Sequence, residues 1–594
     1  MSAEQYRTTR PGLLSAGNVG QTVQVAGWIQ TRRDHGGIVF VDLRDATGIL
    51  QVVLDPEAGS APDEVLSGLR REYVISVIGE VTSRGEEHVN PDLATGEIEL
   101  VATELRVLSP ADPLPFQLDD RVEVDEALRL QYRYLDLRRP AMAANLEARS
   151  TAIRAMRRVL DAAGFLEVET PTLVASTPEG ARDVLVPSRL RQGHFYALPQ
   201  SPQLFKQLLM ISGVDRYYQI ARCYRDEDFR ADRQIEFTQL DLEGAFWGQD
   251  DVLEVLEEIA VAVTKDLRGI DLARPFPRLT WREAMDRFGT DKPDIRFGME
   301  IQDLSHLFTS TEFKAFSGVL AERGTVRGIN AGVQGLSRAG LDGLVERALS
   351  LGARGLVWMV VEDDGSLRSP VAKFLTQGEQ TNLREALGGS AGDLLLVVAD
   401  RFKVVCKVLG ALRIEMGQPE GHEEIAFLMV TDFPMFEIAD DGSLASMHHP
   451  FTSPEDVTEM VESPGTAVSL AYDVVLNGAE LGSGSVRIHN PDVQAKVFEV
   501  LGITAEDASR RFGWFMDALR YGTPPHAGFA YGIDRMVSIL RDLPNIREVI
   551  PFPKTQTGND PLTGSPSRVE DEQLRELGIT VAAEVLASWA EDDA

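Results

Sequence analysis

The chain has 594 residues and a formal net charge of −33 at pH 7, so we expect about three to four domains rather than one core. The negative charge excludes indiscriminate nucleic-acid binding, which requires a basic surface, but it leaves open a nucleic-acid partner held by local arginine patches. The two cysteines, Cys223 and Cys406, exclude a disulfide framework and a cysteine-based zinc site. With no signal peptide and no uncharged apolar run of about 18 residues, the sequence predicts a cytoplasmic protein without a membrane partner.

Residues 1–108 carry five short stretches that alternate or run apolar, separated by turn signals. These stretches are residues 23–30, 37–44, 49–54, 73–82 and 97–108. Five strands in about 100 residues predict a small closed barrel of the oligonucleotide-binding type. Stacking surfaces and donors for single-stranded bases would come from Trp28, Arg32, Arg33, Phe40 and Gln51. The alternative is that Trp28 and Phe40 belong to the core of the barrel.

A proline-rich stretch at 109–115 cannot continue a helix or a strand, so we expect a linker or hinge over 109–140. Residues 147–164 predict an amphipathic helix, because Ile153, Met156 and Leu160 recur at helical spacing. Residues 165–170 then predict a strand that is halted by Pro171. This helix and strand indicate an architectural or subunit-contact element.

Residues 176–183 and 200–210 carry polar side chains that could belong to a functional site. Residues 176–183 form either a mobile lid or a plain turn. Residues 200–210 begin as a turn and become helical. Lys206 lies there in an apolar context, where an unpaired ammonium is costly, so we expect it to have an anionic partner.

Residues 219–243 predict a hairpin whose connecting loop is densely charged. Its second half alternates, with Phe237, Leu240 and Leu242 interleaved with Thr238, Asp241 and Glu243. Such a hairpin can hold several ionised side chains over one floor. A solvated charged turn is the alternative, because charge runs usually face water.

Residues 250–266 predict another amphipathic helix. The composition of the sequence changes from about residue 298 to residue 416. Glycine-rich turns, apolar strands and helical segments there predict an inserted α+β module without a nucleotide-binding motif. Further on, the pair His448-His449 invites a metal-site interpretation, but no HExxH pattern or third ligand lies nearby. Neither a GxGxxG nor a GxxxxGK[ST] phosphate loop is present.

Three stretches in chain order resemble the signature motifs of class II aminoacyl-tRNA synthetases. The helix and strand ending at Pro171 resemble motif 1, Tyr224-Arg225-Asp226-Glu227 resembles motif 2, and the glycines leading to Arg535 resemble motif 3. The closer resemblance is to the bacterial aspartyl-tRNA synthetase family and covers nearly the whole chain. Its motifs are SPQLFKQ (201–207), the stretch 221–241, MHHPFT (447–452), GSGSVRIH (482–489), YGIDR (531–535) and PFPKT (551–555).

This resemblance implies a multidomain α+β fold. Residues 1–108 would form an OB-fold anticodon-binding domain, followed by the hinge at 109–140. Residues 141–297 and 421–594 would form a class II catalytic domain with an antiparallel sheet, interrupted by a bacterial-type insertion at 298–420. The resemblance to motif 1 also implies a homodimer.

The activity implied is activation of L-aspartate by ATP and Mg²⁺ to aspartyl-adenylate, followed by transfer to the terminal ribose of tRNA. Arg225, Glu227 and Arg535 would be catalytic, on the α-phosphate, the adenine and either the γ-phosphate or the second adenine face. Phe237 would stack on adenine, and Asp473 and Glu480 would hold Mg²⁺. The ATP-binding residues implied are Arg225, Asp226, Glu227, Gln234, Phe237, Glu480, Gly532, Ile533, Asp534 and Arg535.

For the amino acid, the resemblance implies that Arg487 and Lys206 bind the side-chain carboxylate of aspartate. Asparagine would leave both cations desolvated and unpaired. The aspartate-binding residues implied are Glu179, Ser201, Gln203, Lys206, Arg225, Asp241, His448 and Arg487.

The resemblance implies that residues of the barrel decide which tRNAs are charged. His35 stands where discriminating members of the family often carry Leu, and His is associated with charging of both tRNA(Asp) and tRNA(Asn). Glu87 occupies the second position linked to relaxed specificity, where Gly is more typical. The anticodon and specificity residues implied are Arg33, His35, Phe40, Gln51 and Glu87. A non-discriminating enzyme would require an amidotransferase downstream.

The alternatives are a discriminating aspartyl enzyme, an asparaginyl- or lysyl-type synthetase, and a non-catalytic RNA-binding paralogue. Lys206 and Arg487 favour an acidic ligand, and the long insertion favours the bacterial aspartyl type.

Overall fold

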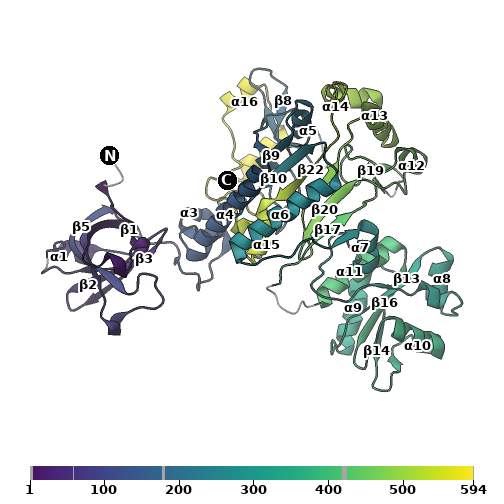
Figure 1. Cartoon of the computed structure of the whole chain (residues 1–594), viewed down its shortest axis with the longest axis horizontal. Helices are drawn as coiled ribbons and strands as arrows, with labels where there is room; N and C mark the ends of the chain where they lie inside the picture. The colour runs from purple at the N-terminus through teal and green to yellow at the C-terminus, as the bar shows by residue number, and fades with distance from the viewer. Residues whose placement is uncertain (1–4, 58, 177–180, 418–423, 440, 593–594) are drawn as a thin grey trace. The chain divides into compact units, whose positions relative to one another are not determined.

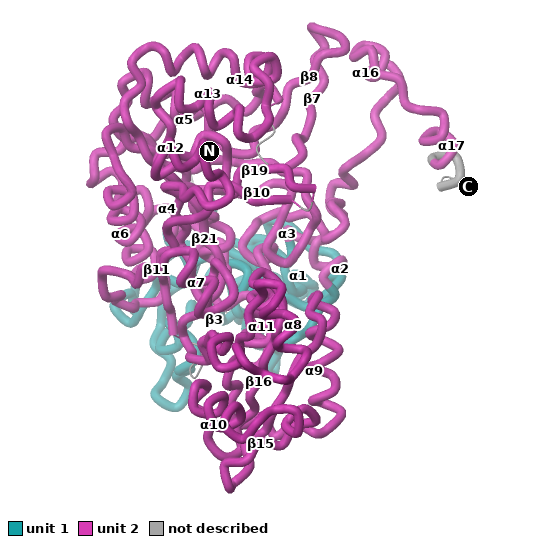
Figure 2. The backbone as a smooth tube through the Cα atoms, turned by 90° about the vertical axis from the view of Figure 1, so that its right-hand side faces the viewer, with its two compact units in different colours: residues 1–125, 135–143 teal, residues 126–134, 144–594 magenta. Residues whose placement is uncertain are grey.

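The computed structural model describes residues 5–57, 59–176, 181–417, 424–439 and 441–592. The backbone divides into two compact units, shown in different colours in Figure 2. The first unit comprises residues 1–125 and 135–143, and the second comprises residues 126–134 and 144–594. None of the described helices is long and apolar enough to cross a membrane.

The first unit contains a closed barrel in the strand order β1-β2-β3-β5-β4, so the predicted five-stranded barrel is confirmed (Figure 1). Its strands are β1 (Thr22–His35), β2 (Ile38–Asp45), β3 (Gly48–Leu54), β4 (Val74–Ser83) and β5 (Ile98–Ser109), with α1 (Asp63–Gly68) between β3 and β4. Alternate residues such as Val25, Val41 and Val77 are fully buried inside the barrel. β1 runs five residues beyond the predicted end because it pairs with β2 up to His35.

The second unit is built on an eight-stranded sheet in the order β11-β17-β20-β21-β22-β10-β9-β6. Its pairs are antiparallel except β11 with β17 and β6 with β9, which are parallel. The strands are β6 (Leu166–Glu167), β9 (Arg216–Tyr224), β10 (Glu236–Ala245), β11 (Arg278–Thr280), β17 (Phe427–Thr431), β20 (Ala471–Leu476), β21 (Ala479–Val486) and β22 (His526–Gly532).

One face of this sheet is covered by three helices, α4 (Pro140–Ala162), α6 (Gln249–Arg268) and α15 (Ile533–Leu540) (Figure 1). Apolar side chains from all three helices share a core with Leu240, Leu242 and Phe529 of the sheet. Helix α4 begins at Pro140, seven residues before the predicted start, because proline is well tolerated in the first turn of a helix. On the opposite face, apolar residues of β17 and β20 pack with Ala284, and β10 carries the buried carboxylates Asp241 and Glu243.

A second sheet, in the order β12-β13-β16-β14-β15, lies within residues 302–400. One of its faces packs on α9 and α11, and the other on α8 and α10. Its elements are β12 (Gln302–Asp303), α8 (Lys314–Ala321), β13 (Thr325–Asn330), α9 (Arg338–Ser350), β14 (Val357–Val361), β15 (Leu367–Arg368), α10 (Gln377–Ala386), β16 (Leu394–Asp400) and α11 (Phe402–Met416). Helix α7 (Trp281–Phe288) precedes this sheet, and the domain boundaries assigned from the sequence stay predictions.

Smaller elements border the large sheet. Helix α5 (Gln203–Ile211) shares an aromatic core with α13 and α14 through Leu204, Phe498 and Phe512. The further described elements are α2 (Glu126–Gln131), α3 (Arg133–Asp136), β7 (Leu185–Pro187), β8 (Phe195–Ala197), β18 (Phe436–Ile438), β19 (Leu444–Ser446), α12 (Val457–Glu462), α13 (Pro491–Val500), α14 (Ala505–Leu519), α16 (Asp571–Leu577) and α17 (Ala583–Asp592).

Candidate active site

The polar face of the large sheet is set by the alternation of residues along β10. Leu240 and Leu242 point into the helix-covered core, so Asp241 and Glu243 point to the opposite face. Phe237 has the same parity as the two carboxylates and lines a cavity with Asp241. The sequence grouping of Phe237 with the two leucines is therefore wrong, because an odd and an even position cannot share one face of a regular strand.

Glycine on the neighbouring strand makes room for these carboxylates. Gly528 of β22 pairs with Glu243 of β10. A Cβ added at Gly528 would lie 1.8 Å from Glu243 Oε2 and 2.3 Å from the Leu242 carbonyl oxygen. Only glycine therefore allows the Glu243 carboxylate to lie flat against β22.

A cavity of about 710 Å³ opens over this face and gathers most of the predicted site residues. Its walls come from α5, the β9–β10 hairpin, β21, the start of α15 and several connecting loops. The predicted residues that line it are Ser201, Gln203, Lys206, Arg225, Glu227, Gln234, Phe237, Asp241, His448, Glu480, Arg487, Gly532, Asp534 and Arg535.

Four predicted residues are not among those that line the cavity. Ile533 is buried in the core beneath the sheet. Asp226 is paired with Arg182 through a backbone hydrogen bond of 3.0 Å and an ion pair of 3.7 Å. Asp473 is 5% exposed on β20, and Glu179 lies outside the described residues.

The floor of the cavity is a buried network of two cations and two carboxylates. Lys206 Nζ lies 3.1 Å from Asp241 Oδ2 and 3.3 Å from Glu243 Oε2, which confirms that this lysine has an anionic partner. Arg487 Nε donates to Glu243 Oε1 at 2.9 Å. All four side chains are at most 2% exposed. Because isolated buried charges are costly, each of the four depends on its neighbours.

Two members of this floor were given no role by the sequence. Glu243 pairs with both cations, and its parity with Asp241 along β10 is the signal that could have identified it. His449 Nε2 lies 2.6 Å from Arg487 Nη1. Burial and the nearby guanidinium hold the pKa of His449 well below its ordinary value, so its ring is neutral. His449 therefore orients Arg487 without adding charge.

The two carboxylates of the floor titrate differently. Burial raises the pKa of Asp241 to about 6, and Lys206 opposes this rise only in part. Burial also acts to raise the pKa of Glu243, but Arg487 and Lys206 together lower it below its ordinary value. Among the described residues, no hydrogen-bond partner reaches Asp241 Oδ1 or the buried Gln203 Nε2. The floor therefore presents an unsatisfied acceptor and an unsatisfied donor to a ligand.

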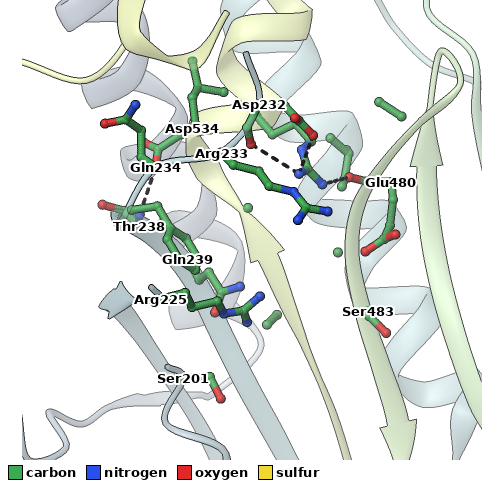
Figure 3. A pocket seen from close by; sticks show the side chains of 18 of the residues that line it. Ser201, Arg225, Asp232, Arg233, Gln234, Thr238, Gln239, Glu480, Ser483 and Asp534 are labelled. Carbon is green, nitrogen blue, oxygen red and sulfur yellow. Dashed lines mark hydrogen bonds and ion pairs between the residues drawn. The ribbon is translucent and has the colours of Figure 1, made fainter. Parts of the chain in front are cut away.

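The other end of the cavity carries arginines around an aromatic ring. The guanidinium carbon of Arg225 lies 5.2 Å from the centroid of Phe237. Arg233 pairs with Glu227 at 2.8 Å, and Arg535 pairs with Asp232 at 3.0 Å. In Figure 3 the Arg225 and Arg233 side chains extend into the cavity. Guanidinium groups around an aromatic face suit a ligand that has both phosphates and a planar base.

Two predicted ATP-binding residues also hold the backbone of the site. Asp534 Oδ2 accepts a hydrogen bond of 2.8 Å from the Thr238 amide, and Asp534 Oδ1 accepts one from Arg149. Gln234 exchanges two hydrogen bonds with the backbone of Lys554, at 3.2 and 2.9 Å. These contacts join β10, α15 and the C-terminal segment around the cavity.

A pair of carboxylates lies near the arginine-lined end of the cavity. Glu480 on β21 has a raised pKa, first because it is buried and then because Asp473 on β20 is close. Burial lowers the pKa of His448, but Asp473, whose Oδ1 lies 3.3 Å from His448 Nε2, raises it above its ordinary value. Two carboxylates that repel each other are a donor set suited to a hard divalent cation such as Mg²⁺.

The barrel carries the predicted anticodon residues on its surface. Arg33 Nη2 lies 2.9 Å from Asp42 Oδ1 and 3.3 Å from Gln51 Oε1. The His35 ring meets Phe40 edge-on at 5.9 Å, and Glu87 is exposed in a short turn. Trp28 and Phe40 are half-buried and absent from the barrel core, so the alternative that they are core residues is wrong.

Comparison with known proteins agrees with this geometry. Residues 125–556 match the family model of class II tRNA synthetases (D, K and N), and residues 23–108 match the OB-fold nucleic acid binding domain. The chain is 53% identical over 585 residues to the Aspartate--tRNA(Asp/Asn) ligase of Moorella thermoacetica, covering 97% of both chains. It is 50% identical over 587 residues to the Aspartate--tRNA ligase of Agathobacter rectalis, covering 98% of both chains.

A solved structure shows the same fold at lower sequence identity. The asparaginyl-tRNA synthetase from Pyrococcus horikoshii, complexed with asparaginyl-adenylate, aligns with a TM-score of 0.57 at 20% identity. The alignment covers 93% of this chain and 97% of that chain. With the family model matched from residue 125 to residue 556, the chain belongs to the class II tRNA synthetases.

Proposed function

We propose that the chain attaches L-aspartate to tRNA in two steps, through an aspartyl-adenylate formed from ATP. The observation that carries this proposal is the buried floor, in which Lys206 and Arg487 face the cavity beside Asp241 and Glu243. The two cations of the floor can hold a further carboxylate beside Asp241 and Glu243, and the unsatisfied Asp241 Oδ1 accepts an ammonium. Aspartate supplies both groups. The names of the two relatives, both of them aspartate--tRNA ligases, support the same substrate.

In this proposal the side-chain carboxylate of aspartate binds Arg487 and Lys206, and its α-ammonium binds Asp241. Arg487 is already oriented by Glu243 and His449, so little reorganisation is required when the substrate arrives. Ser201, Gln203, Glu179 and His448 complete the amino-acid pocket. Asparagine would bring an α-ammonium to Asp241 without a side-chain carboxylate, so Lys206, Arg487 and the ammonium would share only two buried anions.

ATP would bind at the other end of the cavity. Phe237 stacks on adenine with Glu227 nearby, and Arg225 bridges the α-phosphate and the attacking carboxylate. Arg535 neutralises charge on the nucleotide, and Asp473 and Glu480 hold the Mg²⁺ that offsets the phosphate charge. The remaining nucleotide contacts come from Asp226, Gln234, Gly532, Ile533 and Asp534. Catalysis rests on alignment and on fixed positive charge around the α-phosphate.

The adenylate is then attacked by the terminal ribose of tRNA. We infer that the OB-fold barrel reads the anticodon through Arg33, His35, Phe40, Gln51 and Glu87. The enzyme would act as a homodimer in the cytoplasm on both tRNA(Asp) and tRNA(Asn), with an amidotransferase downstream. The name of the Moorella relative, which includes Asp/Asn, favours this range. The name of the Agathobacter relative favours the discriminating alternative, which charges tRNA(Asp) only.

Amino-acid-dependent exchange of pyrophosphate into ATP tests the proposed function. We expect exchange with aspartate and a kcat/KM for asparagine and lysine lower by about 10⁴-fold, because neither compensates both buried cations. Equal exchange with asparagine or lysine would replace the aspartyl assignment with one of those synthetase types. A lack of exchange with every amino acid would support the non-catalytic RNA-binding alternative.

The pKa of Asp241 predicts the pH dependence of aspartate use. Below about pH 6 the free enzyme protonates this carboxyl, which can then no longer pair with the α-ammonium. We therefore expect kcat/KM for aspartate to fall as the pH drops through about 6, whereas kcat/KM for ATP at saturating aspartate keeps a flatter profile.

Two variants test whether Asp241 causes the fall of kcat/KM for aspartate at low pH. Asp241→Asn should abolish it, and His448→Gln should retain it, because His448 is a second group at the cavity whose pKa is raised above its ordinary value. Retention of this fall in Asp241→Asn would contradict the assignment.

Charging of purified tRNA(Asp) and tRNA(Asn) tests the tRNA range. We expect the enzyme to charge both tRNAs. His35→Leu should lower kcat/KM for tRNA(Asn) about tenfold further than it lowers kcat/KM for tRNA(Asp), because it changes the contacts beside Phe40. The matched control is His306→Leu, which makes the same change at an exposed residue of the 302–400 segment. Charging of tRNA(Asn) at background level would establish the discriminating alternative.

A further inference from the structure

The connector between α7 and β12, residues 289–301, borders the active-site cavity although it leads into the second sheet. Lys292 of this connector lines the cavity. Its Nζ lies 3.7 Å from Glu480 Oε2 and 3.8 Å from Asp291 Oδ1. The side chain is 47% exposed, so the ammonium can swing on its four-carbon stem.

The connector is held firmly by Arg413 of α11. This fully buried guanidinium donates through Nη2 to the carbonyl oxygens of Asp294, Phe297 and Gly298 at 2.9, 2.8 and 2.8 Å. Its Cζ also lies 4.1 Å from the Phe297 ring centroid and 4.8 Å from that of Phe288. The second sheet therefore anchors the segment that carries Lys292.

The other side of the connector contacts the turn between β20 and β21. Gly478 in this turn has a φ of +81°, and a Cβ there would lie 3.1 Å from Asp294 Cβ. The two strands joined by the turn carry Asp473 and Glu480. Lys292 is thus placed beside the carboxylate pair by packing on both sides of the connector.

We propose that Lys292 is a further catalytic residue, which binds the β- and γ-phosphates of ATP. The inference rests on the proposed function. A divalent cation held by Asp473 and Glu480 would offset the charge of both carboxylates and weaken the attraction of Lys292 to Glu480. The flexible side chain of Lys292 would then be available to bind the polyphosphate of the nucleotide.

In the reaction, a carboxylate oxygen of aspartate forms a bond to the α-phosphorus. The bond from that phosphorus to the oxygen bridging to the β-phosphate breaks, and its electron pair leaves with pyrophosphate. Lys292 would stabilise the negative charge that accumulates on this leaving group, at the end of the nucleotide away from Phe237. Arg535 already donates through Nη1 to the carbonyl oxygen of Glu480, so Lys292 would add a second cation on this side of the cavity.

Direct calorimetric binding of ATP and of AMP to the full-length protein, with Mg²⁺ present, tests this role. AMP lacks the phosphates that Lys292 would contact. We expect Lys292→Met to weaken ATP binding by at least about tenfold and AMP binding by less than about twofold. Lys292→Arg keeps the charge and should bind ATP within about threefold of the unaltered protein. The matched control, Lys403→Met, removes an exposed lysine from α11 and should change neither affinity.

Equal effects of Lys292→Met on ATP and AMP, or no effect on either, would overturn the proposal. Aspartate-dependent pyrophosphate exchange by the unaltered protein is measured in parallel. If that exchange is absent while ATP binds, the proposed function fails, and the comparison of ATP with AMP still decides the role of Lys292.

Discussion

The site depends on one buried electrostatic network, in which Lys206 and Arg487 are balanced by Asp241 and Glu243. Opposite charges at such burial are tolerated only when their geometry and hydrogen bonds are nearly complete. The surrounding backbone reflects this constraint, since Gly528 leaves space for Glu243 and neutral His449 supports Arg487 without a third positive charge. The one oxygen left without a protein partner among the described residues of this network, Asp241 Oδ1, faces the ligand cavity.

The network also separates the two ends of the cavity to which the proposed function assigns the amino acid and the nucleotide. The floor lies on α5, on β10 and directly after β21, where its side chains are at most 2% exposed. The nucleotide end is lined by the loop between β9 and β10 and by the start of α15, where Arg225, Arg233 and Arg535 are partly exposed. In the proposed function, regular elements thus hold the residues that would select the amino acid, and the longer arginine side chains would bind the flexible phosphates.

Local patterns predicted the elements well. The barrel strands and the helix at α6 follow from alternation and helical spacing, which depend only on neighbouring residues. The start of α4 was missed because a proline in the first turn looks like a helix breaker in sequence. Phe237 was assigned to the wrong face because its aromatic character outweighed its position in the alternation.

The site itself was only partly accessible from the sequence. Most of the aspartate-, ATP- and metal-binding residues named by the resemblance to class II synthetases line the cavity, and the apolar context of Lys206 predicted its anionic partner. Glu243, His449 and Lys292 were missed because their roles arise from contacts across distant segments. Arg487 and Glu243 are 244 positions apart, and Lys292 meets Glu480 only because Arg413 and Gly478 place the connector against the turn.

Substitution of Lys206 by methionine tests the central role of the buried network most directly. The substitution keeps the volume but removes the cation between Asp241 and Glu243. Equilibrium binding of aspartate and of ATP to the folded variant, with folding checked by circular dichroism, is the measurement. The account predicts that aspartate binding weakens by about 100-fold or more while ATP binding changes by less than about threefold. Unchanged aspartate binding, or an equal loss for both ligands, would contradict it.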